Sequence, residues 1–396
     1  MSVQSMKSEQ ADRAELERFR AGVVAALSSL QAPAFDGYWV DHVPTLQRWQ
    51  QTLFEAGLVG VAYPEQFGGR GLTPLHQAVV DEEIARHNLP TPIGGPGLDV
   101  AGLVVVRHAS PDMAERLIPA LLSGRELWSL GFSEPGSGSD LASVSTTAHR
   151  DGDDFVVNGG KIWTGFAAYS SRLLLLARTN VDVPAHRGLS LFVVDMKTDG
   201  LTKSTVHEMT GEPDAERTQF YRLTFSDMRV PASAVVGELD RGWEYLLGAL
   251  SGERGLYILR RHAELRAQFT TLLQAFDIND LSPGQLEDVA RIDVLLQVLH
   301  AQSESTVARA LEHPGESLPE DSADKLFFAF VDQELHHLAI DLLGAYRGTQ
   351  EMTPSGADAH KLSINYLYSR AASIYSGTDQ VQKNIIATRK LGFPRV

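Results

Sequence analysis

The amino-acid sequence predicts an α+β protein in which a central antiparallel β-domain is flanked by two helical domains. Apolar residues recur three and four positions apart over about residues 10–125, and again after Pro231, which is the period of amphipathic helices. Between these regions, from about Trp128, short runs rich in β-branched and aromatic residues alternate with turn residues, a pattern typical of strands. This order predicts domains at residues 1–127, 128–236 and 237–396.

Each region shows its own periodicity. In the first region the helical period is clearest in Leu46, Trp49 and Leu53, and Gly- and Pro-rich segments such as 63–71 interrupt it. The central region contains strand-like segments at 155–159, 172–179, 189–196 and 221–231. The last region predicts helices over 243–275, 286–311, 323–343 and 362–391.

Composition excludes several classes of function. The 396 residues include 35 Lys and Arg against 50 Asp and Glu, so the net charge of −15 disfavours binding to nucleic acid or anionic membranes. The chain has no cysteine, which excludes disulfides, thiolate catalysis and cysteine-ligated metals. No apolar run reaches the length of a membrane span and the first residues do not form a secretory signal, so we expect a cytoplasmic protein.

The densest chemical signal lies in the central region. The segment GFSEPGSGSDLAS (131–143) is followed by NGGKIWTG (158–165). Gly136 and Gly138 allow a backbone to approach a flat ligand closely, and Ser133 and its neighbouring serines offer hydroxyl donors. On composition alone, an ordinary glycine-serine hairpin is the favoured interpretation of the first segment.

The two segments resemble the signature of the acyl-CoA dehydrogenase family, a Thr/Ser-Glu-Pro-x-x-Gly-Ser-Asp loop followed by Asn-Gly-x-Lys-x-Trp. The segment at 372–395 resembles the family's closing Ile-Tyr-x-Gly-Thr-x-x-Ile-Gln motif and the helix after it, and segments 63–71 and 207–231 also agree. The resemblance therefore covers nearly the whole chain. It implies an N-terminal helical domain, a central antiparallel β-domain and a C-terminal four-helix bundle.

The resemblance implies that the protein binds FAD, with the flavin between the β-domain and the C-terminal helices. Hydrogen-bond donors near the flavin N1 and O2 are useful there because reduced flavin is negatively charged at that edge. Ser139 is also implied to contact the acyl-CoA substrate. The positions that match cofactor contacts of the family are Phe132, Ser133, Ser139, Trp163, Thr164, Gly377, Thr378 and Gln380.

The family's reaction needs a carboxylate that removes an α proton while the flavin accepts the β hydrogen as hydride. In many members this carboxylate directly precedes the closing Gly-Thr, but here that position is Ser376, whose hydroxyl is not a base at neutral pH. A known variant carries the base in a Glu-Arg pair on the first helix after the β-domain, which Glu253 and Arg254 match.

The resemblance therefore assigns the α-proton base to Glu253 and a substrate-supporting role to Arg254. It keeps Ser376 in the site as a backbone N–H donor to the thioester oxygen. Taken alone, a Glu-Arg pair is more often a solvated ion pair on a helix surface.

Two segments match the family poorly. They are 266–280 and 341–348, which in the family reach the FAD of a neighbouring subunit. Either FAD is held differently, or a second, different subunit completes the site. Three alternatives to an acyl-CoA dehydrogenase therefore stay open: a flavin oxidase or monooxygenase on the same fold, a dehydrogenase of acyl-carrier-protein thioesters, and a non-catalytic subunit of a hetero-oligomer.

The resemblance also implies partners. Electrons would pass to an electron-transfer flavoprotein or a similar acceptor, and the chain would form a homodimer, a homotetramer or a hetero-oligomer. The helix-borne base favours fatty or branched acyl metabolism, with long or bulky acyl groups. Glu334 and His337 form a single Glu-x-x-His motif, whereas a di-iron bundle needs two, so no metal is expected. Trp243 and Tyr245 are expected to lie in a helix core.

Overall fold

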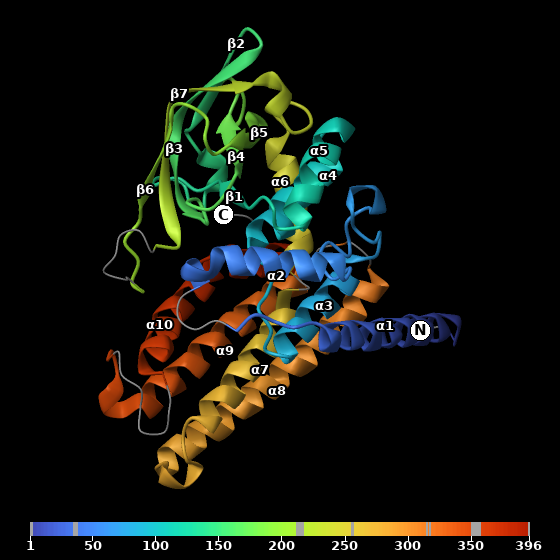
Figure 1. Ribbon diagram of the computed structural model, residues 1–396, viewed down its shortest axis with the longest axis vertical. Coiled ribbons are helices and arrows are strands. Elements are labelled where there is room, and N and C mark those ends of the chain that lie inside the picture. Colours follow the sequence, from blue (N-terminus) through green and yellow to red (C-terminus); the bar gives the residue numbers. More distant parts are fainter. Residues whose placement is uncertain are drawn as a thin grey trace. The chain divides into compact units, whose positions relative to one another are not determined.

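The protein, in this computed structural model, is described over residues 3–34, 39–210, 218–254, 257–313, 316, 318–349 and 358–394, without the side chains of 3–12 and 250–257. The chain forms two compact units, coloured along the sequence in Figure 1. Unit 1 comprises residues 1–29, 74–89 and 254–396, and unit 2 comprises residues 30–73 and 90–253. The predicted three-part division at residues 128 and 237 stays a prediction.

Unit 1 is helical in its described residues. Its longest helices pack on one another around a shared apolar core that includes Leu16, Val79, Leu265, Leu296 and Leu335. The helices are α1 (Val3–Ser29), α3 (Pro74–Arg86), α7 (Tyr257–Gln274), α8 (Pro283–Glu312), α9 (Glu320–Leu343), α10 (Ala359–Ser369) and α11 (Asp379–Ile385). Figure 1 shows α7, α8, α9 and α10 running together.

The continuous helix predicted over 362–391 is wrong. Helix α10 ends at Ser369, a short turn follows, and α11 begins only at Asp379. The break contains Ser376 with φ 53° and Gly377 with φ 89°, left-handed conformations that a right-handed helix cannot include. The helix predicted over 243–275 is described as α6 (Gly242–Arg254) and α7, and residues 255–256 between them lie outside the described part.

Unit 2 contains a sheet covered by short helices. The helices are α2 (Val43–Glu55), α4 (Gly102–His108), α5 (Pro111–Leu122) and most of α6. The strands are β1 (Trp128–Gly131), β2 (Thr147–Asp151), β3 (Asp154–Gly165), β4 (Arg172–Arg178), β5 (Leu189–Asp195), β6 (Leu201–Thr205) and β7 (Phe220–Pro231). They are ordered β1-β4-β2-β3-β7-β6, with β5 paired to β4 off this path.

The sheet is antiparallel except around β4. Strand β1 runs parallel to β4, with Trp128 opposite Arg172, which the sequence pattern did not predict. Strand β4 reads as a continuous apolar run because both of its faces are buried. Leu174 and Leu176 belong to the core shared with α4, α5 and α6, whereas Leu173 belongs to a second core on the other face.

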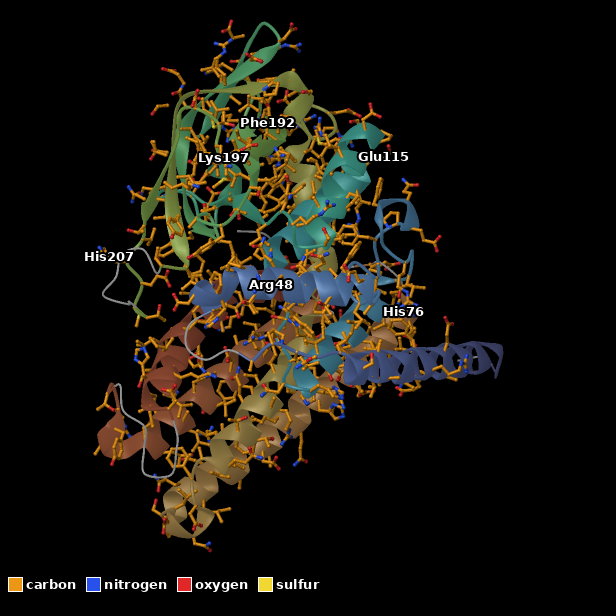
Figure 2. The ribbon with its side chains drawn as sticks, in the orientation of Figure 1. Arg48, His76, Glu115, Phe192, Lys197 and His207 are labelled. Carbon is orange, nitrogen blue, oxygen red and sulfur yellow. The ribbon has the colours of Figure 1, made fainter. Side chains whose placement is uncertain are left out.

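The second core lies among the strands themselves. Phe192 on β5 is fully buried and meets Phe155 of β3 edge-on, with ring centroids 5.2 Å apart; Figure 2 labels Phe192 inside this body. On the helical side, Tyr245 of α6 is buried in the core, as predicted, and Trp243 packs against the same core. None of the described helices combines the length and apolarity needed to cross a membrane.

Candidate functional site

The glycine-serine segment connects β1 to β2, and it begins with a tight turn. The N–H of Glu134 donates to the carbonyl of Ser137, and the N–H of Ser137 donates back to the carbonyl of Glu134, both at 3.0 Å. A Cβ atom placed on Gly136 or Gly138 would meet no atom within 4 Å. The backbone of the turn is therefore open to a ligand, as the sequence interpretation requires.

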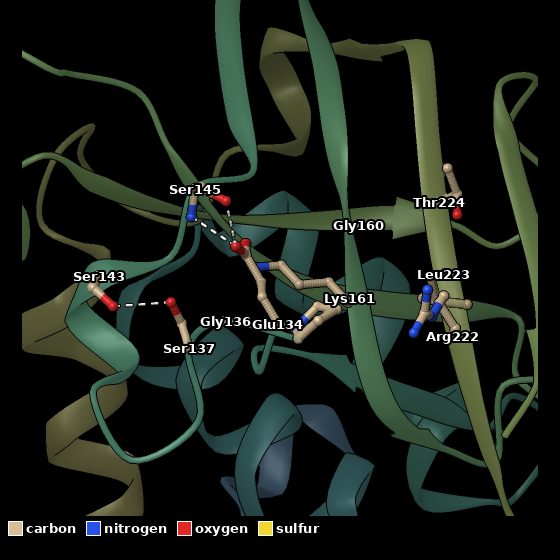
Figure 3. Close-up of a pocket in the computed structure, with 11 residues that line it drawn as sticks. Glu134, Gly136, Ser137, Ser143, Ser145, Gly160, Lys161, Arg222, Leu223 and Thr224 are labelled. Atoms are coloured by element: carbon tan, nitrogen blue, oxygen red, sulfur yellow. Dashed lines mark hydrogen bonds and ion pairs between the residues drawn. The ribbon is translucent and has the colours of Figure 1, made fainter. Parts of the chain in front are cut away.

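A buried ion pair ties this turn to β3. Lys161 Nζ donates to Glu134 Oε1 at 2.8 Å and to the Phe132 carbonyl at 3.0 Å, and the Lys161 and Glu134 side chains are 0% and 5% exposed. Glu134 Oε2 also accepts from the N–H and the hydroxyl of Ser145, each at 2.7 Å, and Oε1 accepts from the N–H of Thr146 at 2.9 Å. Figure 3 shows Glu134 and Lys161 turned toward each other. Both charges of this cluster are thus paired and hydrogen-bonded.

The cluster shifts the pKa values of both charged groups. Burial alone would raise the pKa of Glu134, but Lys161 and the hydrogen bonds from Thr146 and Ser145 outweigh it and lower this pKa to about 2. Burial lowers the pKa of Lys161 to about 8, although the Glu134 carboxylate acts in the opposite direction. Both groups are therefore charged at neutral pH.

The same contacts bring the predicted cofactor residues of the β-domain together. The N–H of Ile162 donates to the carbonyl of Ser133 at 2.9 Å, so the Phe132–Ser133 segment lies along β3. The pairing of β3 with β7 is irregular between Lys161 and Thr164, and Trp163 in this bulge has φ 60° and is 55% exposed. A bulge re-aims a side chain, and here it presents the Trp163 indole at the surface.

The remaining predicted residues of the β-domain are placed differently. Thr164 is fully buried and its hydroxyl has no hydrogen-bond partner among the described residues. It faces away from Trp163, so only its backbone is available to a ligand. Ser139 is exposed, and Phe132 packs partly against the helical-side core.

In unit 1, the side chain of Gln382 holds the Ser376–Gly377 turn by hydrogen bonds. This side chain is fully buried, and its Nε2 donates to the Ser376 carbonyl at 3.0 Å and to the Gly377 carbonyl at 3.3 Å. A Cβ atom on Gly377 would lie 2.7 Å from this nitrogen, and its φ of 89° is left-handed, so both the contact and the backbone favour glycine here.

The turn is also anchored where it enters α11. Thr378 caps this helix, because its hydroxyl accepts from the N–H of Val381 at 3.3 Å. The next residue, Asp379, pairs with the buried Lys325 of α9 at 3.4 Å. Gln380 is exposed on the first turn of α11.

The backbone of Glu253 and Arg254 forms the last turn of α6, and their side chains lie outside the described residues. Their roles stay predictions. The Glu-x-x-His motif contributes to surface contacts: Glu334 forms an ion pair with Arg291, and the His337 ring lies 5.4 Å from that of Tyr366. The described residues contain no cluster of three or more groups suited to hold a metal ion.

Sequence reasoning missed four supporting residues, Glu134, Lys161, Lys325 and Gln382. Glu134, Lys161 and Gln382 lie inside the motifs that carry the resemblance, but the sequence assigned none of them a role. Lys161 could have been found, because it lies in a predicted strand with apolar neighbours. A lysine is almost never fully buried unless it is paired, so its position indicates a buried acidic partner.

A pocket of about 510 Å³ opens beside the glycine-serine turn. Figure 3 shows it between the turn, β3 and β7. Its lining combines the ion pair with hydroxyls, one further cation and apolar surface from residues such as Leu223. The lining residues are Glu134, Pro135, Gly136, Ser137, Ser143, Ser145, Gly160, Lys161, Arg222, Leu223 and Thr224.

These residues fit a flavin cofactor. The exposed Trp163 indole offers a flat apolar surface, and the hydroxyls of Ser133 and Ser139 have no partner within the described ranges. An isoalloxazine ring binds against a flat apolar surface, and its polar edge needs hydroxyl and backbone hydrogen-bonding groups within reach.

A fold of helical, β and helical parts with such a donor set defines a class of flavin-dependent oxidoreductases. Family models match the chain in three consecutive parts: the acyl-CoA dehydrogenase N-terminal domain at 13–125, the middle domain at 129–228 and the C-terminal domain at 240–391. The chain therefore belongs to the acyl-CoA dehydrogenase family, whose members are flavoproteins. The predicted family and fold are confirmed.

Relatives and solved structures agree. The chain is 33% identical over 378 residues to the acyl-CoA dehydrogenase IpdE1 of Mycobacterium tuberculosis, covering 95% of this chain and 94% of the relative. It is 28% identical to the long-chain specific mitochondrial enzyme of Sus scrofa, covering 84% and 76%. A variant of the steroid ACAD Tcur3481-Tcur3483 superimposes with a TM-score of 0.79 at 25% identity, covering 97% and 100%. The ChsE4-ChsE5 complex of M. tuberculosis gives 0.73 at 25%, covering 100% and 99%.

Replacing Glu134 with Gln is expected to destabilise the protein by about 3–5 kcal/mol, because it leaves Lys161 buried without a counter-charge. Urea unfolding followed by tryptophan fluorescence measures this loss. The double variant Glu134→Gln, Lys161→Met should recover part of the stability, since it removes both charges. A double variant less stable than Glu134→Gln alone contradicts this account.

The stabilisation from Glu134 also depends on pH. Its folded pKa of about 2 lies below the ordinary 4.5, so this stabilisation is fully present above pH 4.5 and is lost as the pH falls toward 2. We expect the free energy of unfolding of the wild type to approach that of Glu134→Gln over this interval. A difference that stays constant from about pH 5 to about pH 3 argues against the shifted pKa.

Proposed function

We propose that the protein is a FAD-dependent acyl-CoA dehydrogenase that converts an acyl thioester to the trans-2-enoyl thioester. The observation that carries this proposal is the Glu134–Lys161 pair, which ties the Phe132–Ser133 segment to β3, the strand that also carries the exposed Trp163. This arrangement supplies a flat surface and hydroxyl donors at one edge, inside motifs that match the family in sequence.

The residues that would hold FAD follow from the resemblance. In unit 2, Phe132 and Ser133 would contact the pyrimidine side of the flavin, with Trp163 and the backbone of Thr164 on the other edge. Ser139 would contact both FAD and the passing substrate. In unit 1, the residues assigned to the adenosine part are Gly377, Thr378 and Gln380.

In the reaction, Glu253 removes the α proton of the acyl group onto its carboxylate. The electron pair of the broken C–H bond forms the double bond between the α and β carbons. Bound FAD supplies the acceptor for the β hydrogen, which leaves as hydride. The backbone N–H of Ser376 donates to the thioester oxygen, which gains negative charge during proton removal, and Arg254 supports the substrate.

The substrate we favour is a bulky acyl thioester of coenzyme A. Two features support this class: the Glu-Arg pair at 253–254, to which the resemblance assigns the base, and the similarity to a structure whose title names a steroid ACAD. Acyl carrier proteins present the same pantetheine arm, so the experiment below compares acyl groups on coenzyme A with the same groups on an acyl carrier protein.

A second candidate is a subunit that needs a different partner chain. It is favoured by Ser376 in place of the common carboxylate, and by the similarity to the ChsE4-ChsE5 complex, whose title names two components. Purified alone, such a chain would carry no flavin and show no turnover until the partner was added.

The test of the proposed function is anaerobic mixing of the purified protein with a panel of acyl thioesters while the flavin absorbance near ~450 nm is recorded. The panel contains short, branched, long and polycyclic acyl groups on coenzyme A, and matched groups on an acyl carrier protein. Bleaching by one class identifies the substrate. Fast reoxidation by air would favour a flavin oxidase, and a flavin that no thioester bleaches would overturn the proposal.

Replacing Glu253 with Gln is expected to keep the bound flavin and to slow bleaching by about 10²–10⁴-fold, because the proton acceptor is removed. Stopped-flow absorbance with the best thioester measures the rate. The matched control is Glu244→Gln, which changes an exposed glutamate of the same helix paired with Arg241. Equal rates in both variants would exclude Glu253 as the base.

Replacing Gln382 with Met is expected to slow bleaching by about tenfold at saturating thioester with little change in apparent affinity, because the Ser376 N–H is no longer held in place. The matched control is Gln297→Met, an exposed glutamine of α8 that bonds Asp293. A loss of thermal stability without any change in rate would indicate that Gln382 serves packing alone.

A further inference from the structure

The second half of the glycine-serine segment is fixed by the side chain of Arg178. This residue ends β4, and its guanidinium donates to three backbone carbonyls. Nη2 donates to Ala142 at 2.9 Å, Nε to Val144 at 3.1 Å and Nη1 to Ala185 at 3.1 Å. Its own N–H donates to the carbonyl of Thr146 at 2.8 Å, so the backbone that carries the guanidinium is fixed as well. One arginine therefore joins two surface segments that β2, β3 and β4 separate in the sequence.

The carbonyls that Arg178 binds belong to two short turns. The carbonyls of Ala142 and Val144 lie at the end of the 3-10 turn η4 (Leu141–Ser143), and Ala185 begins the 3-10 turn η5 (Ala185–Arg187). The last carbonyls of a short helix have no partner within it, and a nearby arginine can supply the missing hydrogen bonds. Because a guanidinium presents its donors as a rigid planar fork, one side chain can serve both turns.

The positive charge of Arg178 has no acidic partner. In the part of the chain that the structure describes it forms no ion pair, whereas Arg172 at the other end of β4 pairs with Glu126 and Asp195, each at 3.2 Å. Burial lowers the pKa of Lys161, and the charge of Arg178 acts in the same direction. Arg178 therefore lies near the ion pair that fixes the first half of the segment, and its hydrogen bonds go to carbonyls alone.

Residues 138–140 lie between two fixed points of this segment. Before them, Ser137 is buried and closes the tight turn, and its hydroxyl lies 2.9 Å from that of Ser143 (Figure 3). After them, η4 is held by Arg178. The three residues between these points are exposed. The position of the exposed stretch, which includes Ser139, therefore depends on how firmly its two ends are held.

We propose that Arg178 is a positioning residue for the proposed reaction, which fixes residues 138–140 so that Ser139 meets the acyl thioester in one conformation. The inference rests on the proposed function, because that function assigns Ser139 to the substrate. A loop that is already held at both ends loses less conformational freedom when a ligand binds. Since Arg178 acts on a substrate contact and not on the proton acceptor, it affects substrate affinity and leaves the rate of the chemical step nearly unchanged.

The test compares Arg178→Gln and Arg178→Lys with the matched control Arg150→Gln. Arg150 is an exposed arginine of β2 that also donates to a backbone carbonyl, that of Gly152 at 3.2 Å, outside the glycine-serine segment. The melting temperature and the flavin content of each variant separate a local effect from a failure to fold. If Arg178→Gln does not fold, Arg178→Lys carries the test, because it keeps the charge and loses the planar fork.

Hydrogen exchange of the purified protein measures how firmly the segment is held. The N–H groups of Ser143 and Val144 donate within and just after η4, at 3.1 and 3.4 Å. Arg178→Gln is expected to speed the exchange of these two amides by about tenfold, because the turn opens more often once its carbonyls lose their donor. Arg150→Gln should leave both amides at the wild-type rate.

Stopped-flow bleaching with the most active coenzyme A thioester of the panel measures the effect on the substrate. In Arg178→Gln, the thioester concentration that gives half of the limiting rate is expected to rise about tenfold, while the limiting rate changes by less than about twofold. Arg178→Lys should recover part of this loss. A purely structural role would lower the melting temperature or the flavin content without separating affinity from rate.

The inference is overturned if Arg178→Gln matches Arg150→Gln in apparent affinity, whatever the exchange rates show, or if its limiting rate falls as far as its affinity. The proposed function can fail separately. If no thioester bleaches the wild type, calorimetry with coenzyme A replaces the kinetic measurement. A weaker coenzyme A affinity in Arg178→Gln would then keep the positioning role and exclude the dehydrogenase assignment, whereas a wild type that binds no coenzyme A would overturn both.

Discussion

The buried ion pair between Glu134 and Lys161 is the interaction on which the β-domain part of the site depends. It lies where the turn after β1, the start of β2 and the middle of β3 meet, and each of these segments contributes a hydrogen bond to it. Two charges removed from water are tolerated only when their remaining hydrogen-bonding groups are satisfied. The pair therefore fixes the Phe132–Ser133 backbone more tightly than apolar contacts, which have no directional requirement.

Both predicted halves of the site contain a residue other than glycine in a left-handed conformation. Trp163 has φ 60° in the bulge of β3, and Ser376 has φ 53° before Gly377. Such conformations cost about 1–2 kcal/mol each and persist only where the surroundings enforce them. The ion pair and the β3–β7 ladder enforce the first, and the buried Gln382 amide enforces the second.

Much of the fold follows from local pattern, whereas the supports of the site do not. The alternation in β3 and β7 and the continuous apolar run of β4 are visible in the sequence, since they reflect one or two buried faces. The parallel pairing of β1 with β4 is not visible, because register between distant strands depends on tertiary packing.

The same distinction holds for the site. The glycines and serines at 131–143 indicate a ligand loop, but the partner of Glu134 is a lysine 27 positions away. Gly377 is a local signal for the break between α10 and α11, since glycine favours the left-handed conformation found there. The helical spacing of apolar residues on both sides nevertheless predicted one continuous helix.

The discontinuous make-up of unit 1 has a consequence for biosynthesis. Helices α1 and α3 leave the ribosome first, yet they share their core with α7, α8 and α9, which are translated after the entire sheet. Until then Leu16 and Val79 lack the residues that bury them in the folded protein, so the nascent chain exposes apolar helical surface during most of its synthesis. We therefore expect burial of these two helices to be completed only after α7, α8 and α9 have been translated.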